Sequence, residues 1–295
     1  MRRIAPKAAA RKKGSPVRRQ AKTATRRNPT SKNRVRKRPL TIRTLTLPVG
    51  ALRALTPDQR SAIFLLGLFL NEANWLRKLL AISVVSIGDG PDGQANFALT
   101  VQIATTLAAK VYEGWNKVRA GDLAKTIHAL ALPDELKALR KEINRALAAP
   151  TIRTIRNSYS FHYPAALDIA KLASIDDTDS VIYVTDSAYN GDVFSHLSSL
   201  IALEPLLAIN AAADWRTALV SVWNDVLKVA GLYCFFLSEA LALLISQYLA
   251  GKFTTTTIIK RNAPTIHELA FRFFVHPPSN LEELREQVVL KARTG

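Results

Sequence analysis

Two long stretches of this sequence repeat their apolar residues every three or four positions, and this pattern constrains the fold more than any other. The first begins at Thr56-Pro57-Asp58-Gln59, which has the composition of a helix start, and continues to about Ile82. After a glycine-rich break at 88–93, the second runs from about Gln94 to Val118. A shorter helical pattern follows from Pro133 to about Leu147. Broad apolar faces of this kind bury themselves against other helices, so the sequence predicts a mainly α fold built as a helical bundle.

The pattern changes in the second half of the chain. A small β-hairpin is predicted near 181–194, because short β-rich runs flank Asn190-Gly191, a dipeptide typical of tight turns. Helical spacing returns from Leu206 to Leu249, with a break expected near Gly231, and a Thr-rich strand is predicted from Phe253 to Ile259.

One apolar run, Val229 to Ala250, is long enough to span a bilayer. Glu239 lies at its centre, and a carboxylate at bilayer depth is costly. We therefore favour a helix buried within the bundle over a membrane span, and we expect no membrane partner.

Charge divides the chain into a tail and a body. Residues 1–43 hold 17 of the 41 Lys and Arg residues and no Asp or Glu, so the rest carries 24 basic against 23 acidic side chains. Such a segment is expected to be a disordered basic tail, because its charges repel and it has little to bury. We accordingly divide the chain into this tail, a bundle domain at 44–250, and a C-terminal extension at 251–295 that packs on the bundle.

A basic tail of this kind has a polyanion as its natural ligand, because Lys and Arg release counterions from RNA or DNA when they neutralise phosphates. Its composition also fits a solubilising arm, an organelle transit peptide or a nuclear address. The nucleic-acid contacts of the tail are assigned to Arg11, Lys12, Lys13, Arg18, Arg19, Arg26, Arg27, Arg34, Arg36, Lys37 and Arg38.

Few residues are candidates for chemistry in the body. The five histidines show no metal-binding spacing, and the chain has no glycine-rich phosphate loop and no nucleophile-elbow motif. The single cysteine, Cys234, excludes a disulfide framework within the chain. We expect no metal and no cofactor, and we expect a cytoplasmic location, since a reducing compartment fits and no secretory signal is visible.

One polar and aromatic segment, from Ile155 to Tyr163, stands apart from this background. It contains Arg156-Asn157, four further residues, and then His162. This arrangement, together with two long helices before it and a hairpin after it, resembles the HEPN superfamily of all-helical ribonucleases and RNA-binding domains. The resemblance covers about Thr56 to Ala250. It implies a metal-independent endoribonuclease, among toxin or phage-defence nucleases, in which Arg156, Asn157 and His162 form the catalytic set.

The chemistry of these side chains agrees with that role. RNA cleavage without a metal requires a group that moves a proton, which His162 can supply, and a fixed cation beside the phosphoryl oxygens, which Arg156 can supply. Asn157 can orient a ligand. The residues assigned to substrate binding are Arg153, Ser158, Tyr159 and Tyr163, whose tyrosine rings can stack on bases.

Six positions along a regular helix do not bring Arg156 and His162 to one face. Either a helix begins between them or two chains contribute. The resemblance implies a symmetric homodimer with two Arg/His sets in one cleft. A second Arg-Asn-x4-His pattern, Arg261 to His267, is interrupted by Pro264, so we assign the site to the first.

The leading hypothesis is therefore an endoribonuclease that acts on RNA, with an antitoxin or inhibitor protein as a further partner. A non-catalytic nucleic-acid-binding dimer, in which the tail provides affinity, is the alternative. A viral structural nucleoprotein is a third hypothesis, although the long amphipathic helices count against a jelly roll.

Overall fold

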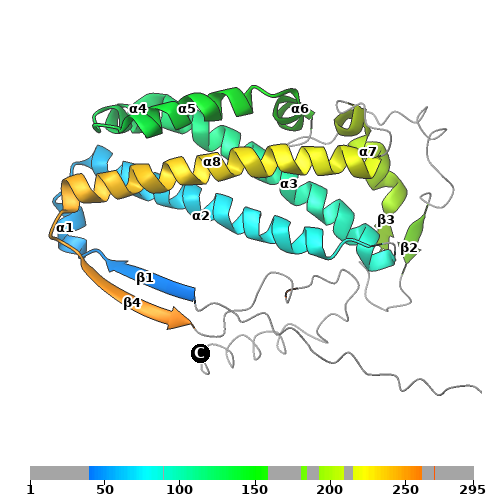
Figure 1. The fold of residues 1–295 in the computed structure, drawn as a ribbon, viewed down its shortest axis with the longest axis horizontal. Coiled ribbons are helices and arrows are strands. Elements are labelled where there is room, and N and C mark those ends of the chain that lie inside the picture. The colour runs from blue at the N-terminus through cyan, green and yellow to red at the C-terminus, as the bar shows by residue number, and fades with distance from the viewer. Residues whose placement is uncertain are drawn as a thin grey trace, which may run out of the picture. The chain divides into compact units, whose positions relative to one another are not determined.

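The computed structural model describes residues 40–88, 90–158, 181–184, 193–208, 215–260 and 269. These residues are mainly helical, as predicted, and Figure 1 shows long helices lying side by side. The basic residues assigned to the tail, Arg11 to Arg38, lie outside the described residues. In chain order the elements are β1 (Leu40–Thr46), α1 (Val49–Arg53), α2 (Pro57–Val85), α3 (Pro91–Arg119), α4 (Gly121–His128), α5 (Asp134–Leu147), α6 (Pro150–Ser158), β2 (Ile182–Val184), β3 (Val193–Ser195), α7 (His196–Ala208), α8 (Trp215–Leu249) and β4 (Thr254–Lys260).

The start of α2 shows why the first predicted helix forms. The Gln59 backbone N–H donates to Thr56 Oγ1 at 3.3 Å, and the Thr56 N–H donates to Gln59 Oε1 at 3.0 Å. This reciprocal capping box satisfies two backbone donors that have no partner within the helix. Pro57 supplies the first helical residue, and Pro91 does the same for α3. The predicted helices at 56–82 and 94–118 are thus confirmed.

The prediction of a break near Gly231 is wrong, because helix α8 runs without interruption from Trp215 to Leu249. One glycine inside a helix costs about 1 kcal/mol relative to alanine. Burial of many large side chains of α8 outweighs that cost. The helix ends instead before Gly251, whose φ of 69° is a left-handed conformation that closes a helix at little steric cost.

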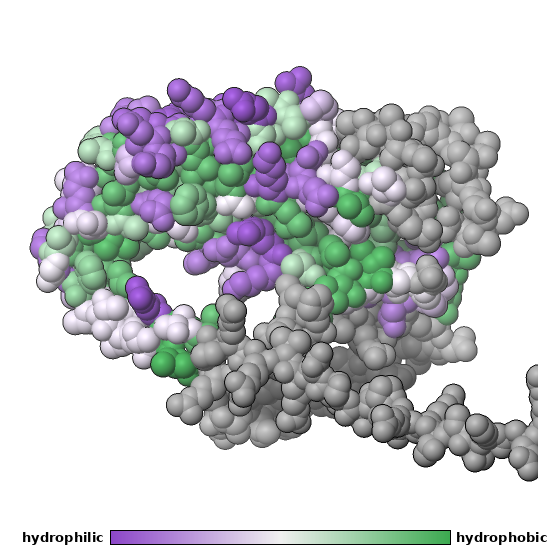
Figure 2. Space-filling view, in the orientation of Figure 1, coloured by the Kyte–Doolittle hydropathy of each residue, from purple (hydrophilic) through white to green (hydrophobic). Residues whose placement is uncertain are grey.

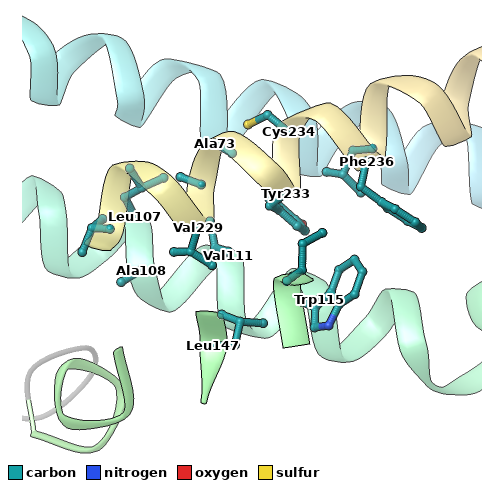
Figure 3. Packing of buried hydrophobic residues seen from close by; sticks show 14 of the residues in the cluster. Ala73, Leu107, Ala108, Val111, Trp115, Leu147, Val229, Tyr233, Cys234 and Phe236 are labelled. Atoms are coloured by element: carbon teal, nitrogen blue, oxygen red, sulfur yellow. The ribbon is translucent and has the colours of Figure 1, made fainter. Parts of the chain in front are cut away.

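The core lies where α8 packs on α2, α3 and α5. Trp115 of α3 is fully buried, and its ring meets Phe236 edge to face with 5.1 Å between the ring centroids and Tyr233 with 6.3 Å (Figure 3). Leu107 and Val111 continue the same face of α3 toward α8. Edge-to-face pairs add to the hydrophobic stabilisation from their burial.

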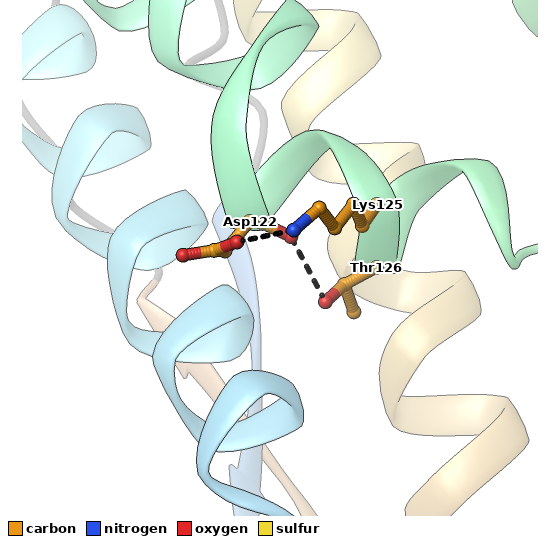
Figure 4. Close-up of polar contacts among 3 residues, drawn as sticks. All are labelled: Asp122, Lys125 and Thr126. Carbon is orange, nitrogen blue, oxygen red and sulfur yellow. Dashed lines mark hydrogen bonds and ion pairs between the residues drawn. The ribbon is translucent and has the colours of Figure 1, made fainter.

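Helices α4 and α5 carry a hydrophilic outer face (Figure 2). Helix α4 starts at Gly121, whose φ is 80°. In its first turn Lys125 Nζ lies 2.9 Å from Asp122 Oδ1, and Thr126 Oγ1 donates to the Asp122 carbonyl at 3.3 Å (Figure 4). The hydrogen bond from Lys125 lowers the pKa of Asp122, although both groups are exposed. This exposed ion pair therefore contributes little to the free energy of folding.

Two short antiparallel sheets accompany the helices. Strands β2 and β3 pair with Ile182 opposite Ser195, which confirms the predicted hairpin near 181–194. The turn dipeptide Asn190-Gly191 lies outside the described residues. Strand β4 confirms the predicted Thr-rich strand and pairs with β1, with Leu40 opposite Lys260. The first four residues of β1, Leu40 to Arg43, belong to the segment that the charge pattern assigned to the tail.

Helix α8 contains a segment, Thr217–Leu249, that is long and apolar enough to cross a membrane, the single such helix among the described residues. It packs on α2, α3 and α5. Glu239, which lies within this segment, is exposed.

Helix α2 carries a second apolar stripe opposite the one it buries. Phe64, Leu68 and Trp75 are 58%, 51% and 73% exposed, although they are large apolar side chains. Spacings of four and seven residues place all three on one side of the helix. We call this set, Phe64, Leu68 and Trp75, the α2 stripe.

The close approach of Gly93 to Gly88 generates a prediction about stability. A Cβ added at Gly93 would overlap the backbone of Gly88, whereas one added at Gly231 would meet nothing within 4 Å. Backbone cannot move aside as a flexible side chain can, so Gly93→Ala should lower the free energy of unfolding by about 1 to 3 kcal/mol. Gly231→Ala, the matched control, should raise it by about 0.5 to 1 kcal/mol. Urea denaturation measures both, and equal stability of the two variants would contradict the prediction.

Candidate functional site

The short helix α6 carries Arg153, Arg156 and Asn157. Its apolar residues Ile152 and Ile155, three positions apart, are fully buried where α6 packs on α3. That contact turns the opposite side of the helix outward, so the three polar side chains are exposed. Two isoleucines thus determine which way the predicted site residues face.

A partly buried hydrogen bond anchors the first turn of α6 to α8. Thr151 is 4% exposed, and its hydroxyl donates to Asp225 Oδ2 over 2.9 Å. Asp225 belongs to α8, so the bond joins two residues that are 74 positions apart in sequence. Hydrogen bonds to charged groups stabilise more than neutral ones. This contact therefore holds α6 in its orientation.

Three helices converge on one pocket of about 260 Å³. Helix α6 contributes the three polar residues named above, and α3 and α5 contribute the rest. We call it the arginine pocket, and the described residues that line it are Tyr112, Asn116, Arg119, Asn144, Leu147, Ala148, Arg153, Arg156 and Asn157. Positions 112, 116 and 119 follow one another at helical spacing, so α3 presents them on a single face.

Arg156 is held over an aromatic ring. Its Cζ lies 4.4 Å from the centroid of the Tyr112 ring. A guanidinium that stacks by its flat face keeps its N–H donors at its edge, where they can meet a carboxylate or a phosphate in pairs. Tyr112 thus orients Arg156 and leaves its donor edge for a ligand.

The lining has one sign of charge. Arg119, Arg153 and Arg156 are permanently protonated, and none of the described residues that line the pocket is acidic. Converging arginines and amides make a surface that binds anions, and phosphate matches the fork of a guanidinium. The same residues include no His, Asp, Glu, Lys or Cys, so the described lining is suited to bind a phosphate group and to stabilise charge on it.

The structure thus brings three of the predicted site residues, Arg153, Arg156 and Asn157, into one pocket. Ser158 ends α6, and its side chain lies outside the described residues. So do Tyr159, His162 and Tyr163, and also the second pattern at 261–267.

Four polar or aromatic residues of the arginine pocket were not predicted from the sequence. They lie on α3 and α5, and their helical spacing was visible only as part of an amphipathic pattern. These residues are Tyr112, Asn116, Arg119 and Asn144.

Other polar groups of the bundle do not join this pocket. Glu72 and Lys110 line a separate groove between α2 and α3, and Lys110 Nζ lies 3.6 Å from Glu72 Oε2. Burial raises the pKa of the Cys234 thiol, which makes it a poor nucleophile. Within the part of the chain that the structure describes, no group of three or more His, Cys, Asp or Glu side chains could hold a metal ion.

Comparison with known proteins identifies no relative: no family model matches the chain, and no curated protein or solved structure is significantly similar to it.

The bond between Thr151 and Asp225 predicts how the site depends on α8. Thr151→Val keeps the shape of the side chain and removes the hydroxyl, which leaves a partly buried carboxylate without this donor. We expect the free energy of unfolding to fall by about 1 to 3 kcal/mol. Thr151→Ser keeps the hydroxyl and should lose less than half of that. Urea denaturation of the three proteins measures the difference, and a Val variant as stable as the wild type would contradict the prediction.

Proposed function

We propose that this protein is an RNA-binding endoribonuclease that works without a metal ion, and that the arginine pocket holds the phosphate at the cleavage point. The observation that carries the proposal is the convergence of Arg119, Arg153 and Arg156 without an acidic neighbour among the described lining residues. Phosphodiesters are the abundant cellular ligand for such a surface. The resemblance of the Arg156-Asn157-x4-His162 segment to the HEPN superfamily supplies the expected reaction.

Cleavage would proceed by attack of the ribose 2′-oxygen on the adjacent phosphorus, with loss of the 5′-oxygen of the next nucleotide. One proton leaves the 2′-hydroxyl and one reaches the departing oxygen, so the reaction is balanced without a further reactant. Arg156 stabilises the charge on the phosphoryl oxygens. His162 is proposed as the proton carrier, because it follows the last residue of α6, Ser158, by only four positions in the sequence.

The tail and the arginine pocket have separate tasks in this proposal. The basic residues before position 40 provide affinity for any polyanion, and the pocket positions one phosphate. The resemblance further suggests a cytoplasmic toxin or phage-defence enzyme, which an antitoxin or inhibitor protein would restrain.

A non-catalytic RNA-binding protein is the second candidate. It is favoured by the lining itself, since the described residues of the pocket can bind phosphate and include no His, Asp or Glu to carry a proton. This candidate predicts salt-sensitive RNA binding without cleavage products.

Cleavage of RNA in the presence of EDTA separates the two candidates. Arg156→Ala and His162→Ala should each lower the cleavage rate by about 100-fold or more, because each removes a group that acts in the transition state. Arg156→Lys should fall between wild type and alanine, since it keeps the charge and loses the planar fork. Arg53→Ala, which changes an exposed arginine of α1 outside the pocket, is the control.

Cleavage that survives both alanine changes would contradict the catalytic assignment. RNA binding by the wild type without any product would support the non-catalytic candidate.

A homodimer is also proposed, with the α2 stripe as its contact surface. Large apolar side chains that are more than half exposed and aligned along one helix are typical of an interface. Two copies of α2 can pair across a two-fold axis, which brings the same stripe together from each chain.

The dimer can be tested by sedimentation of the full chain. Trp75→Glu should convert the dimer to a monomer, because it places a charge in the apolar contact. Glu113→Gln, which changes an exposed residue of α3, should leave the mass unchanged. A monomeric wild type would overturn this contact.

A further inference from the structure

A hydrogen bond from the core determines whether Asn144 offers a donor or an acceptor to the arginine pocket. The Trp115 side chain is fully buried, and its indole N–H donates to Asn144 Oδ1 over 2.7 Å. An indole nitrogen can only donate. Breaking this bond would leave a buried donor without an acceptor, which is costly, so the bond persists in the folded protein.

The bond prevents rotation of the Asn144 amide. A flip would exchange Oδ1 for Nδ2 and place two donors against each other, so the carbonyl oxygen stays on the Trp115 side. Asn144 is exposed and lines the pocket. The Nδ2 group, with its two N–H donors, is therefore available to a ligand in a fixed orientation.

The fixed amide has the same hydrogen-bonding character as its neighbours. Arg119, Arg153 and Arg156 are also donors that cannot accept. A ligand that touches these four groups must accept from each of them, while the Asn116 and Asn157 amides and the Tyr112 hydroxyl of the same lining can also accept. The non-bridging oxygens of a phosphodiester do so, whereas most base edges present a donor beside an acceptor.

We propose that Asn144, locked by Trp115, is a specificity-determining residue that makes the arginine pocket select the phosphodiester of a nucleic-acid strand over its bases. This inference rests on the proposed function, and it adds a residue from α5 and a preference for the phosphodiester over the bases. Binding at the pocket is then insensitive to base sequence.

Asn144→Asp tests the inference without removing the support of Trp115. A carboxylate oxygen still accepts from the indole N–H, while the donor group is replaced by a second, charged acceptor. The variant should fold with a melting temperature close to that of the wild type. Its affinity for a phosphodiester should fall at least about tenfold, which is the loss of roughly one charge-assisted hydrogen bond.

The readout is the melting temperature of the full chain with and without the dinucleotide UpU, with uridine as the ligand that lacks a phosphate. The first ribose of each dinucleotide carries a 2′-O-methyl group, so that the ligand cannot be cleaved during the measurement. A ligand that binds the basic tail equally in the folded and unfolded chain does not shift the melting temperature, whereas a ligand of the folded pocket raises it. At a concentration of about ten times the dissociation constant, UpU should raise the melting temperature of the wild type by about 2 to 4 °C, and uridine should not. ApA and GpG should act as UpU does.

Ala138→Asp is the matched control, because it adds the same charge to an exposed position of α5 outside the pocket lining. It should keep the UpU shift, and Asn144→Asp should lose most of it. Equal shifts in the two variants, beside a reduced shift in Arg156→Ala, would overturn the role of Asn144 and leave the proposed pocket intact. A shift with GpG alone would overturn the phosphodiester preference. No shift with any dinucleotide in the wild type would overturn this inference and the proposed pocket together.

Discussion

The burial of Trp115 is the interaction on which the rest of the bundle depends. Its ring lies against Tyr233 and Phe236 of α8, and its nitrogen reaches Asn144 of α5. One side chain of α3 therefore contacts α8 through apolar packing and α5 through a hydrogen bond. Apolar burial provides most of the free energy, and the single hydrogen bond specifies the relative rotation of α3 and α5.

The contacts of Trp115 also link the core to the arginine pocket. Asn144 has one face toward Trp115 and the other toward the pocket, and Tyr112, three residues before Trp115 on α3, supports Arg156. Helix α6 is placed by its buried face, where Ile152 and Ile155 pack and Thr151 bonds to Asp225. The cationic groups thus stand on rigid helices, and little reordering is needed when a phosphate binds.

Periodicity predicted the long helices well, because α2 and α3 bury many side chains at regular spacing and each begins with a proline, which α2 precedes with a capping box. It missed β1, which follows an arginine-rich segment and pairs with a strand about 200 residues later. Gly231 suggested a break that the burial of α8 overrides. The motif located Arg156 and Asn157, but no local pattern could join them to Tyr112 and Asn144, since those neighbours depend on how three helices cross.

The pairing of β1 with β4 has a consequence for synthesis on the ribosome. Strand β1 is made before every described helix, and its partner, Thr254 to Lys260, is made after the last of them. At 5 to 20 residues per second, β1 waits on the order of 10 to 40 s for that partner. During this interval its backbone donors and acceptors are an open edge for other chains. The adjoining basic segment, with no acidic residue before position 44, provides charge repulsion that keeps nascent copies apart.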